Sequence, residues 1–159
     1  AYHNEEGVGN AVQKSGINRK EIFLVSKVWI SNYGYEKAKA SVDESLRKLQ
    51  TDYIDLMLLH QPFCDRYGAY RALEEAYKEG KLRAIGVSNF YPDHFIDIAS
   101  NMEIVPAVNQ VETHVFDQQI EAENNGGVRY TYHVMGSVCR RAEQFIHEFA
   151  TCRNRTQVR

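Results

Sequence analysis

The sequence predicts an α/β fold in which a parallel sheet of about four strands is flanked by helices. Short apolar runs alternate with longer segments that place apolar residues at helical spacing, and this alternation occurs four times. Strands separated by helices are joined by right-handed crossovers, which makes neighbouring strands parallel. A complete (β/α)8 barrel needs about 250 residues. Since the chain has 159 residues, we expect about half of such a barrel.

The helices are predicted by apolar residues that recur on one face. From Ala38 to Leu49, four apolar residues follow at spacings of four, four and three, which buries one side of a helix. Asn4 is expected to cap the first helix, and Gly80 to close the third with a left-handed residue. The expected helices span residues 5–14, 35–49, 69–79 and 92–100, and a further one starts near residue 118.

The strands are predicted by short, partly β-branched apolar runs. They cover residues 21–29, 53–60, 84–88 and 106–112. Each run contains or ends in a polar residue, and these residues are Lys27, His60, Ser88 with Asn89, and Gln110. Such barrels bind ligands at the carboxyl ends of their strands. Taken singly, each polar residue is more often structural, but four strands delivering such groups to one rim favour a functional site, because a buried charge is costly unless it is paired.

Composition excludes several function classes. The chain is 43% hydrophobic and 25% charged with a formal net charge of −2, which is typical of one soluble globular domain and gives no basic footprint for nucleic acid. We expect no membrane partner, because no apolar run approaches the roughly 18 residues of a membrane span and no signal peptide opens the chain. Cys64, Cys139 and Cys152 are odd in number and irregularly spaced, so we expect no disulfide framework, no metal site and a reducing cytoplasm. A pairing of His60 with Cys64 as metal ligands is the weaker interpretation.

Four motifs together resemble the aldo-keto reductase family. They are AYHNEEGVG at residues 1–9, SKVW at 26–29, LLHQP at 58–62 and GVSNF at 86–90. They occur in the family's order and at its spacing, and the resemblance covers about residues 1–123. It implies a TIM barrel and the NADPH-dependent reduction of the carbonyl group of an aldehyde or ketone to an alcohol.

The resemblance also implies a catalytic set. Tyr2 matches the family's proton donor, and a free phenol with a pKa near 10 is a poor acid at neutral pH. Lys27 matches the ammonium group that lowers the pKa of that phenol. His60 matches the residue that donates to the substrate oxygen and orients the carbonyl group. The aspartate that pairs with this lysine in the family precedes the tyrosine, so we expect Lys27 to lack that partner.

Cofactor and substrate contacts follow in the same way. Three residues match those that hold the nicotinamide carboxamide, whose amide needs both a donor and an acceptor: Ser88, Asn89 and Gln110. Trp29 matches an aromatic wall of the substrate pocket, and a core tryptophan is an equal alternative. Tyr33 and Phe63 are expected to line the same mouth. The family binds the cofactor's phosphates with loops after later strands, so we expect weak or absent NADPH binding and impaired activity in this chain.

Residues 124–159 depart from this pattern and are expected to form an atypical tail after the half-barrel of residues 1–123. No alternation is visible at 127–138, so no further strand is expected there. We hypothesise that the tail is translated out of frame. Residues 135–147 can be encoded so that a neighbouring frame reads SWGPFAEGQNNLFT, residues 124–132 can yield RIMEESGIHI, and residues 149–159 can yield SQLAEIGRKY. The alternative is an authentic divergent tail with one amphipathic helix near residues 139–150.

Two other functions compete with a reductase. The first is a non-catalytic barrel relative that serves as an interaction subunit. The second is a half-barrel that associates with itself, because open parallel edges attract partners.

Overall fold

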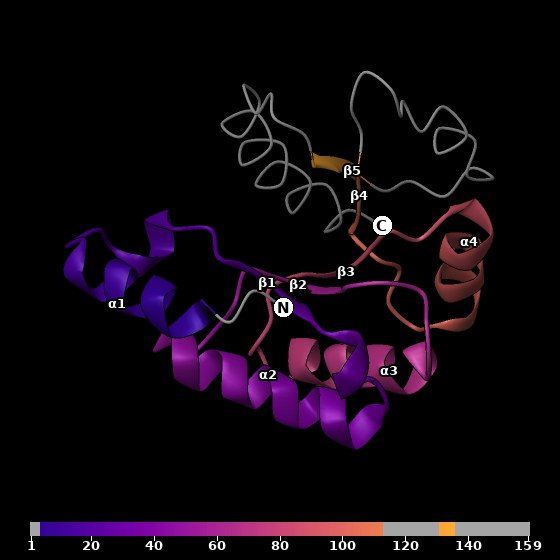
Figure 1. Ribbon diagram of the computed structural model, residues 1–159, viewed down its shortest axis with the longest axis horizontal. Helices are drawn as coiled ribbons and strands as arrows, with labels where there is room; N and C mark the ends of the chain where they lie inside the picture. Colours follow the sequence, from indigo (N-terminus) through magenta and orange to yellow (C-terminus); the bar gives the residue numbers. More distant parts are fainter. Residues whose placement is uncertain (1–3, 113–130, 136–159) are drawn as a thin grey trace, which may run out of the picture.

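The computed structural model describes residues 4–112 and 131–135, which form a five-stranded parallel sheet in the order β1-β2-β3-β4-β5 (Figure 1). Each strand lies beside the next one in the chain, so every crossover advances by one position, as it does around a barrel. The predicted partial α/β barrel is therefore confirmed. The strands are β1 (Val25–Val28), β2 (Leu56–Leu59), β3 (Ile85–Ser88), β4 (Val108–Glu112) and β5 (Thr131–Met135).

The helices match the predicted segments closely. They are α1 (Glu5–Lys14), α2 (Tyr35–Leu49), α3 (Arg66–Lys78) and α4 (Pro92–Asn101), with single 3₁₀ turns η1 (Arg19–Glu21) and η2 (Ile30–Asn32). Helix α3 begins at Arg66 rather than at residue 69, because Asp65 Oδ1 accepts a hydrogen bond from the Gly68 amide at 2.9 Å and caps the helix earlier. Gly80 has the expected positive φ of 79°. Asn4 occupies the predicted N-cap position of α1, but its side chain makes no capping hydrogen bond.

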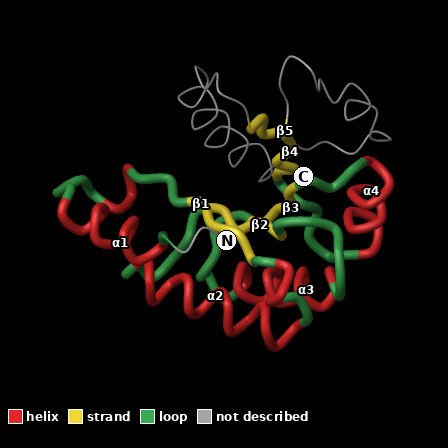
Figure 2. Tube along the Cα trace, in the orientation of Figure 1, coloured by secondary structure: helices red, strands yellow, loops and turns green. Residues whose placement is uncertain are grey.

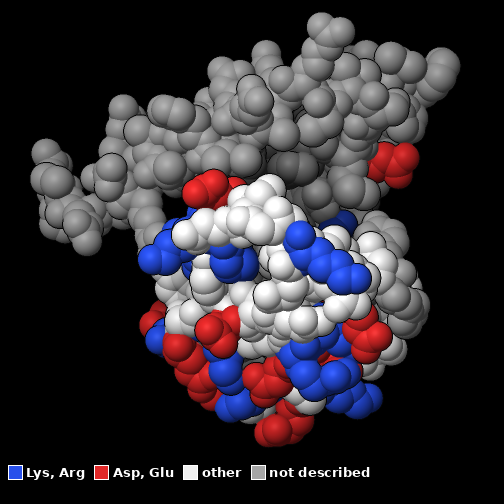
Figure 3. Space-filling model, turned by 90° about the vertical axis from the view of Figure 1, so that its left-hand side faces the viewer, with Lys and Arg blue, Asp and Glu red and all other residues white. Residues whose placement is uncertain are grey.

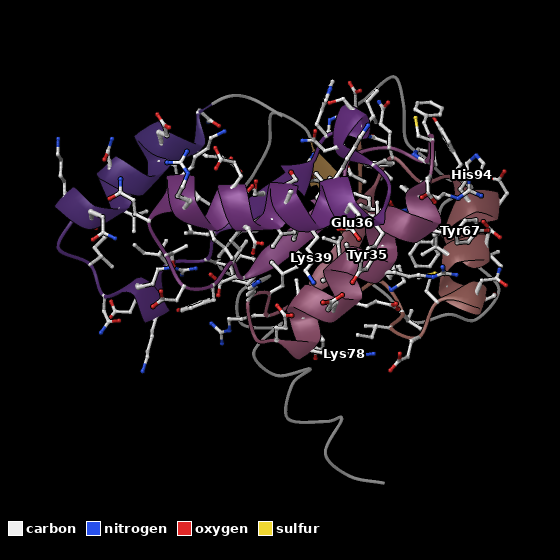
Figure 4. The ribbon with its side chains drawn as sticks, turned by 90° about the horizontal axis from the view of Figure 1, so that it is seen from below. Tyr35, Glu36, Lys39, Tyr67, Lys78 and His94 are labelled. Carbon is white, nitrogen blue, oxygen red and sulfur yellow. The ribbon has the colours of Figure 1, made fainter. Side chains whose placement is uncertain are left out.

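Helices α2 and α3 run side by side over one face of the sheet (Figure 2). Lys39 of α2 bonds Glu75 of α3 at 2.5 Å, and the Tyr35 hydroxyl also donates to Glu75. Tyr35 and Lys39 lie where the two helices meet (Figure 4). Lysine and arginine side chains alternate with acidic ones over the surface in Figure 3. The outer layer is therefore fastened by interspersed charge pairs, each of modest strength because it is exposed.

Strand β5 is the main departure from the predicted fold. It pairs with β4 over its whole length, from Val108 opposite Thr131 to Glu112 opposite Met135. The prediction of no strand at residues 127–138 was therefore wrong. Thr, Tyr and Val favour extended backbone, and the free edge of β4 offers backbone partners that simple alternation does not reveal. The expected helix near residue 118 and the expected helix at 139–150 lie outside the described residues.

The sheet separates two apolar clusters. The larger one packs between sheet and helices and includes Val28, Leu59 and Val87. The smaller one covers the opposite, inner face of the sheet and consists of Leu56, Leu58, Ala84 and Val108. Successive side chains of a strand point to opposite faces. These two clusters therefore show which face each of the remaining side chains on β1 to β4 points to.

Gly86 of β3 shows how closely the strands approach on the inner face. A Cβ atom at Gly86 would lie 2.5 Å from the Val108 carbonyl oxygen and 2.9 Å from Leu58 Cδ2. Distances below 3.0 Å require neighbouring atoms to move, and here one neighbour is backbone. Glycine is therefore needed at this position for packing.

The amino-terminal ends of the strands are fastened by Asp55, which is 1% exposed. Its carboxylate forms ion pairs with Arg19 and Arg83, both at 2.8 Å, and accepts a hydrogen bond from the Leu24 amide at 3.0 Å. Arg19 also stacks over the Tyr53 ring at 4.1 Å. This cluster ties the segments leading into β1, β2 and β3 together at the end of the barrel that stabilises such folds.

Candidate functional site

Four of the predicted site residues converge on the inner face, at the carboxyl ends of the strands. Lys27 lies opposite Leu58 in the β1–β2 register, and Ser88 lies opposite Gln110 in the β3–β4 register. His60 follows Leu58 by two positions and therefore points the same way. The clearest link crosses β2: Lys27 Nζ donates to Ser88 Oγ at 3.4 Å. The predicted convergence of Lys27, His60, Ser88 and Gln110 on one rim agrees with this geometry.

Lys27 is a partly buried cation with a neutral partner. Burial lowers the pKa of its ammonium group, because removal from water disfavours the charged form. Within residues 4–112, no carboxylate forms an ion pair with Lys27; its contact is the Ser88 hydroxyl. The site therefore holds a positive charge that the described residues do not neutralise.

Both backbone groups of His60, its amide and its carbonyl oxygen, are hydrogen-bonded to neighbouring segments. Its amide donates to the Val28 carbonyl oxygen at 3.2 Å, and its carbonyl oxygen accepts from Asn89 Nδ2 at 3.1 Å. Its imidazole ring packs against the Trp29 indole with centroids 4.5 Å apart. Burial, followed by the positive charge of Lys27, lowers the pKa of His60. The imidazole is therefore neutral at physiological pH, which leaves an N–H donor without an added charge.

The imidazole also has an unused polar atom. His60 Nδ1 is buried and has no hydrogen-bond partner among the described residues. Buried polar atoms are usually satisfied, so an orphaned one indicates a group that works with a ligand or a further segment.

Asn89 joins β2, β3 and β4 at the rim. Its Nδ2 donates to the His60 carbonyl oxygen and, at 3.2 Å, to Ser88 Oγ, while its backbone amide donates to the Gln110 carbonyl oxygen at 2.9 Å. The Ser88 hydroxyl donates to the same Gln110 oxygen at 2.9 Å. Asn89 Oδ1 accepts no hydrogen bond from residues 4–112, so a ligand donor can use it.

The aromatic residues expected at the mouth separate into two groups. Trp29 is 40% exposed and Phe63 is 54% exposed, so neither is a core residue. Tyr33 is 6% exposed, and the prediction that it lines the mouth was wrong. Its hydroxyl donates to the Gln61 carbonyl oxygen at 2.7 Å and accepts from the Gln61 amide at 3.0 Å. A backbone partner on a neighbouring loop, which sequence does not show, draws Tyr33 inward, and burial raises the pKa of its phenol.

Asn109 is a polar residue that sequence analysis did not assign. It lies on β4 opposite Val87, is 1% exposed and bonds both backbone groups of Phe90. Its position in the predicted strand could have revealed it. Asn109 alternates with the inward-pointing residues, so its side chain points to the face that the helices cover and is buried there. A buried amide needs hydrogen-bond partners.

Tyr2 lies outside the described residues, so its proximity to Lys27 and His60 stays a prediction. Cys64 is an exposed free cysteine, and Cys139 and Cys152 lie outside the described residues. Residues 4–112 contain no cluster of three or more His, Cys, Asp or Glu side chains suited to a metal ion. None of the helices described above is long and apolar enough to cross a membrane.

Comparison with known proteins identifies relatives of the first four-fifths of the chain. The model of the Aldo/keto reductase family matches residues 1–126. A glyoxal reductase of Bacillus subtilis is 52% identical over 114 residues, which cover 71% of this chain and 41% of the relative. A 9,11-endoperoxide prostaglandin H2 reductase of Trypanosoma cruzi is 45% identical over 119 residues, covering 74% and 42%. The chain thus spans about two-fifths of the length of these curated relatives.

Solved structures show the same relationship. An aldo/keto reductase from Brucella melitensis superposes with a TM-score of 0.82 at 36% identity, covering 94% of this chain and 62% of that one. An aldo-keto reductase of Bombyx mori, solved in complex with NADP, superposes with a TM-score of 0.66 at 32% identity, covering 70% and 41%.

Proposed function

Because the chain belongs to the aldo/keto reductase family, we propose that the protein reduces aldehydes or ketones to alcohols with NADPH. The observation that carries this proposal is the 3.4 Å contact between Lys27 Nζ and Ser88 Oγ, which brings a catalytic candidate beside a cofactor-binding candidate. His60 shares this face and has a buried ring nitrogen that finds no hydrogen-bond partner among the described residues. We also propose a cytoplasmic location and a small carbonyl compound as the partner.

The catalytic roles are divided among three residues. Tyr2 gives its phenolic proton to the carbonyl oxygen as the carbonyl carbon accepts a hydride, and solvent then reprotonates the phenolate. Lys27 lowers the phenol pKa, since a nearby positive charge favours the phenolate. Neutral His60 donates an N–H hydrogen bond to the same oxygen and stabilises the charge that develops there.

The cofactor would lie against the rim formed by Ser88, Asn89 and Gln110. Ser88 and Gln110 are 1% and 8% exposed, so a carboxamide held there is largely shielded from water, and Asn89 Oδ1 offers it an acceptor. NADPH supplies the hydride when bound. Trp29, exposed beside His60, would form one wall of the substrate pocket.

The test is the NADPH-dependent reduction of 4-nitrobenzaldehyde by the 159-residue chain, with product detected by chromatography. We expect a slow rate above the blank that Tyr2→Phe and Lys27→Met abolish. Tyr77→Phe is the matched control, since Tyr77 is 42% exposed on α3, the helix on the other face of the sheet. A rate unaffected by Tyr2→Phe contradicts the catalytic assignment.

Cofactor affinity is tested separately by fluorescence titration. We expect NADPH to bind weakly, because the phosphate-binding loops of the family follow later strands. Micromolar affinity would show that residues of this chain replace those loops.

A second candidate function is self-association of the half-barrel or service as an interaction subunit. It is favoured by two exposed apolar side chains, Val25, which is 46% exposed on β1, and Trp29, which is 40% exposed just after this strand. Large apolar side chains open to solvent favour a covering partner. Analytical ultracentrifugation that shows a monomer at every concentration would count against self-association.

A further inference from the structure

Asn109 makes two hydrogen bonds to one residue of the neighbouring strand end. Its Nδ2 donates to the Phe90 carbonyl oxygen at 2.6 Å, and its Oδ1 accepts from the Phe90 amide at 3.4 Å. Both residues are 1% exposed, so water does not compete for these groups. A side chain that satisfies both backbone groups of one residue continues the sheet pairing beyond the end of β3.

The residue before Phe90 is Asn89, which has a positive φ of 59°. Such a backbone is disfavoured for a non-glycine residue and persists where surrounding contacts fix it. Two adjacent residues of β4 supply those contacts. The Gln110 carbonyl oxygen accepts a hydrogen bond from the Asn89 amide at 2.9 Å, and the Asn109 side chain bonds the backbone of Phe90.

We propose that Asn109 is a positioning residue for the cofactor rim: it holds Phe90 so that Asn89 keeps its left-handed backbone and directs its side chain to the His60 carbonyl oxygen and Ser88 Oγ. In that orientation Asn89 presents Oδ1 to the nicotinamide carboxamide. This last step rests on the proposed function, whereas the positioning of Asn89 does not. Asparagine is required because the position needs a donor and an acceptor on a short neutral side chain.

The first measurement needs no cofactor. Amide hydrogen exchange of the full chain is followed at Asn89 and Phe90 in wild type, Asn109→Leu and Asn109→Asp. We expect the protection factors of these two amides to fall about ten- to a hundredfold, the range for a buried hydrogen bond left unmade, while the amides of β2 stay protected. Asn101→Leu is the matched control, since Asn101 bonds Asp97 within α4 and its loss should leave Asn89 and Phe90 unchanged.

Asn109→Asp provides a second test, because lowering the pH should restore the hydrogen bonds of this variant, which would not happen if Asn109 served only in packing. A carboxylate keeps the acceptor but opposes the Phe90 carbonyl oxygen with a negative charge. Protonation restores a donor, and burial raises the pKa of such a carboxyl. Protection at Phe90, corrected for intrinsic exchange, should therefore recover as the pH is lowered in Asn109→Asp and not in Asn109→Leu. Unchanged protection in both variants, or no recovery with acid, overturns the positioning role.

The cofactor step is tested with NADPH itself. If wild type binds NADPH measurably, Asn109→Asp should raise the dissociation constant at least fivefold at neutral pH while the exchange of β2 is unchanged. Lost protection with unaltered NADPH affinity would refute the presentation of Asn89 to the carboxamide. If wild type shows no measurable NADPH binding, the proposed cofactor function fails for this chain, and the exchange data still decide whether Asn109 positions Asn89.

Discussion

The Trp29 indole and the His60 imidazole pack with centroids 4.5 Å apart and planes inclined by 53°. Trp29 is the sole tryptophan of the chain. Its emission therefore reports on one place in the protein, the rim where the catalytic candidates meet. A protonated imidazolium quenches a neighbouring indole, so the fluorescence of this protein should follow the charge of His60.

We predict that Trp29 emission titrates with a midpoint below 6.5, the ordinary pKa of histidine, because burial and then the Lys27 charge lower the pKa of His60. Lys27→Met removes the second cause and should raise the midpoint. Lys20→Met, an exposed cation on η1, should not move it. His60→Gln should abolish the transition, and a midpoint above 6.5 in wild type would contradict the described electrostatics.

The same shift makes His60 a source of acid sensitivity. The unfolded chain binds a proton at His60 near pH 6.5, whereas the folded chain does so only at lower pH. The free energy of unfolding should therefore fall as the pH drops from about 6.5 to the folded pKa of His60, and His60→Gln should flatten this part of the urea-unfolding profile. An unchanged slope in the variant would show that other groups govern the decline.

Lys27→Met should stabilise the fold while removing activity. The lowered pKa of Lys27 means that its charged form is disfavoured in the folded state, so an apolar replacement should raise the free energy of unfolding at pH 7. The advantage should shrink as the pH approaches 10.5, where the unfolded lysine also loses its proton. Urea unfolding at pH 7 and pH 10 checks this, and a less stable variant at pH 7 would contradict it.

Asp55→Asn should destabilise the fold strongly. Asp55 is buried between Arg19 and Arg83, and removing one partner of a buried ion pair costs about 3 kcal/mol. Asp43→Asn breaks an exposed pair with Lys81 and should cost less than about 1 kcal/mol. Equal effects of the two variants on urea unfolding would show that the Asp55 cluster does not fasten the strands.

Gly86→Ala should cost about 2 kcal/mol, because the added methyl group would press on the Val108 backbone. Gly7→Ala is the opposite control: Gly7 lies in α1, and apart from its chain neighbours and the backbone of its own helix an added Cβ would meet nothing within 4 Å. Alanine should therefore stabilise the fold by up to about 1 kcal/mol. Thermal unfolding of both variants distinguishes packing from backbone entropy, and a neutral Gly86→Ala would mean that β3 and β4 can separate at little cost.

The coding DNA would show whether the reading frame changes after residue 123. We propose that residues 124–159 are translated in a shifted frame. Sequencing the coding DNA should show that a single-base shift restores the strings SWGPFAEGQNNLFT, RIMEESGIHI and SQLAEIGRKY. If no single-base shift does so, the tail is authentic, with the amphipathic helix near residues 139–150 as its expected form.

The inward-pointing site residues could be predicted because they obey local rules. Lys27, Ser88 and Gln110 share one parity along apolar runs, and the ends of parallel strands meet at one rim. The partners of Tyr33 could not be predicted in this way, since its inward turn depends on Gln61, a residue on a separate loop.

The remaining misses have the same cause. Asn109 acquires its role only from a partner on another strand end. The two arginines on Asp55 come from separate segments. Strand β5 forms along an edge supplied by β4. Each depends on long-range pairing, which composition and periodicity do not encode.

The Asp55 cluster and His60 occupy opposite ends of β2, separated by only the four residues Leu56–Leu59. Mutagenesis of this one segment would therefore separate two kinds of defect. Changes at Asp55 or within the buried Leu56–Leu59 would cause poor yield and a low melting temperature, whereas changes at His60 would give well-expressed protein with altered turnover. The segment around strand β2 thus contains both kinds of position, those where substitutions harm folding and those where they harm chemistry.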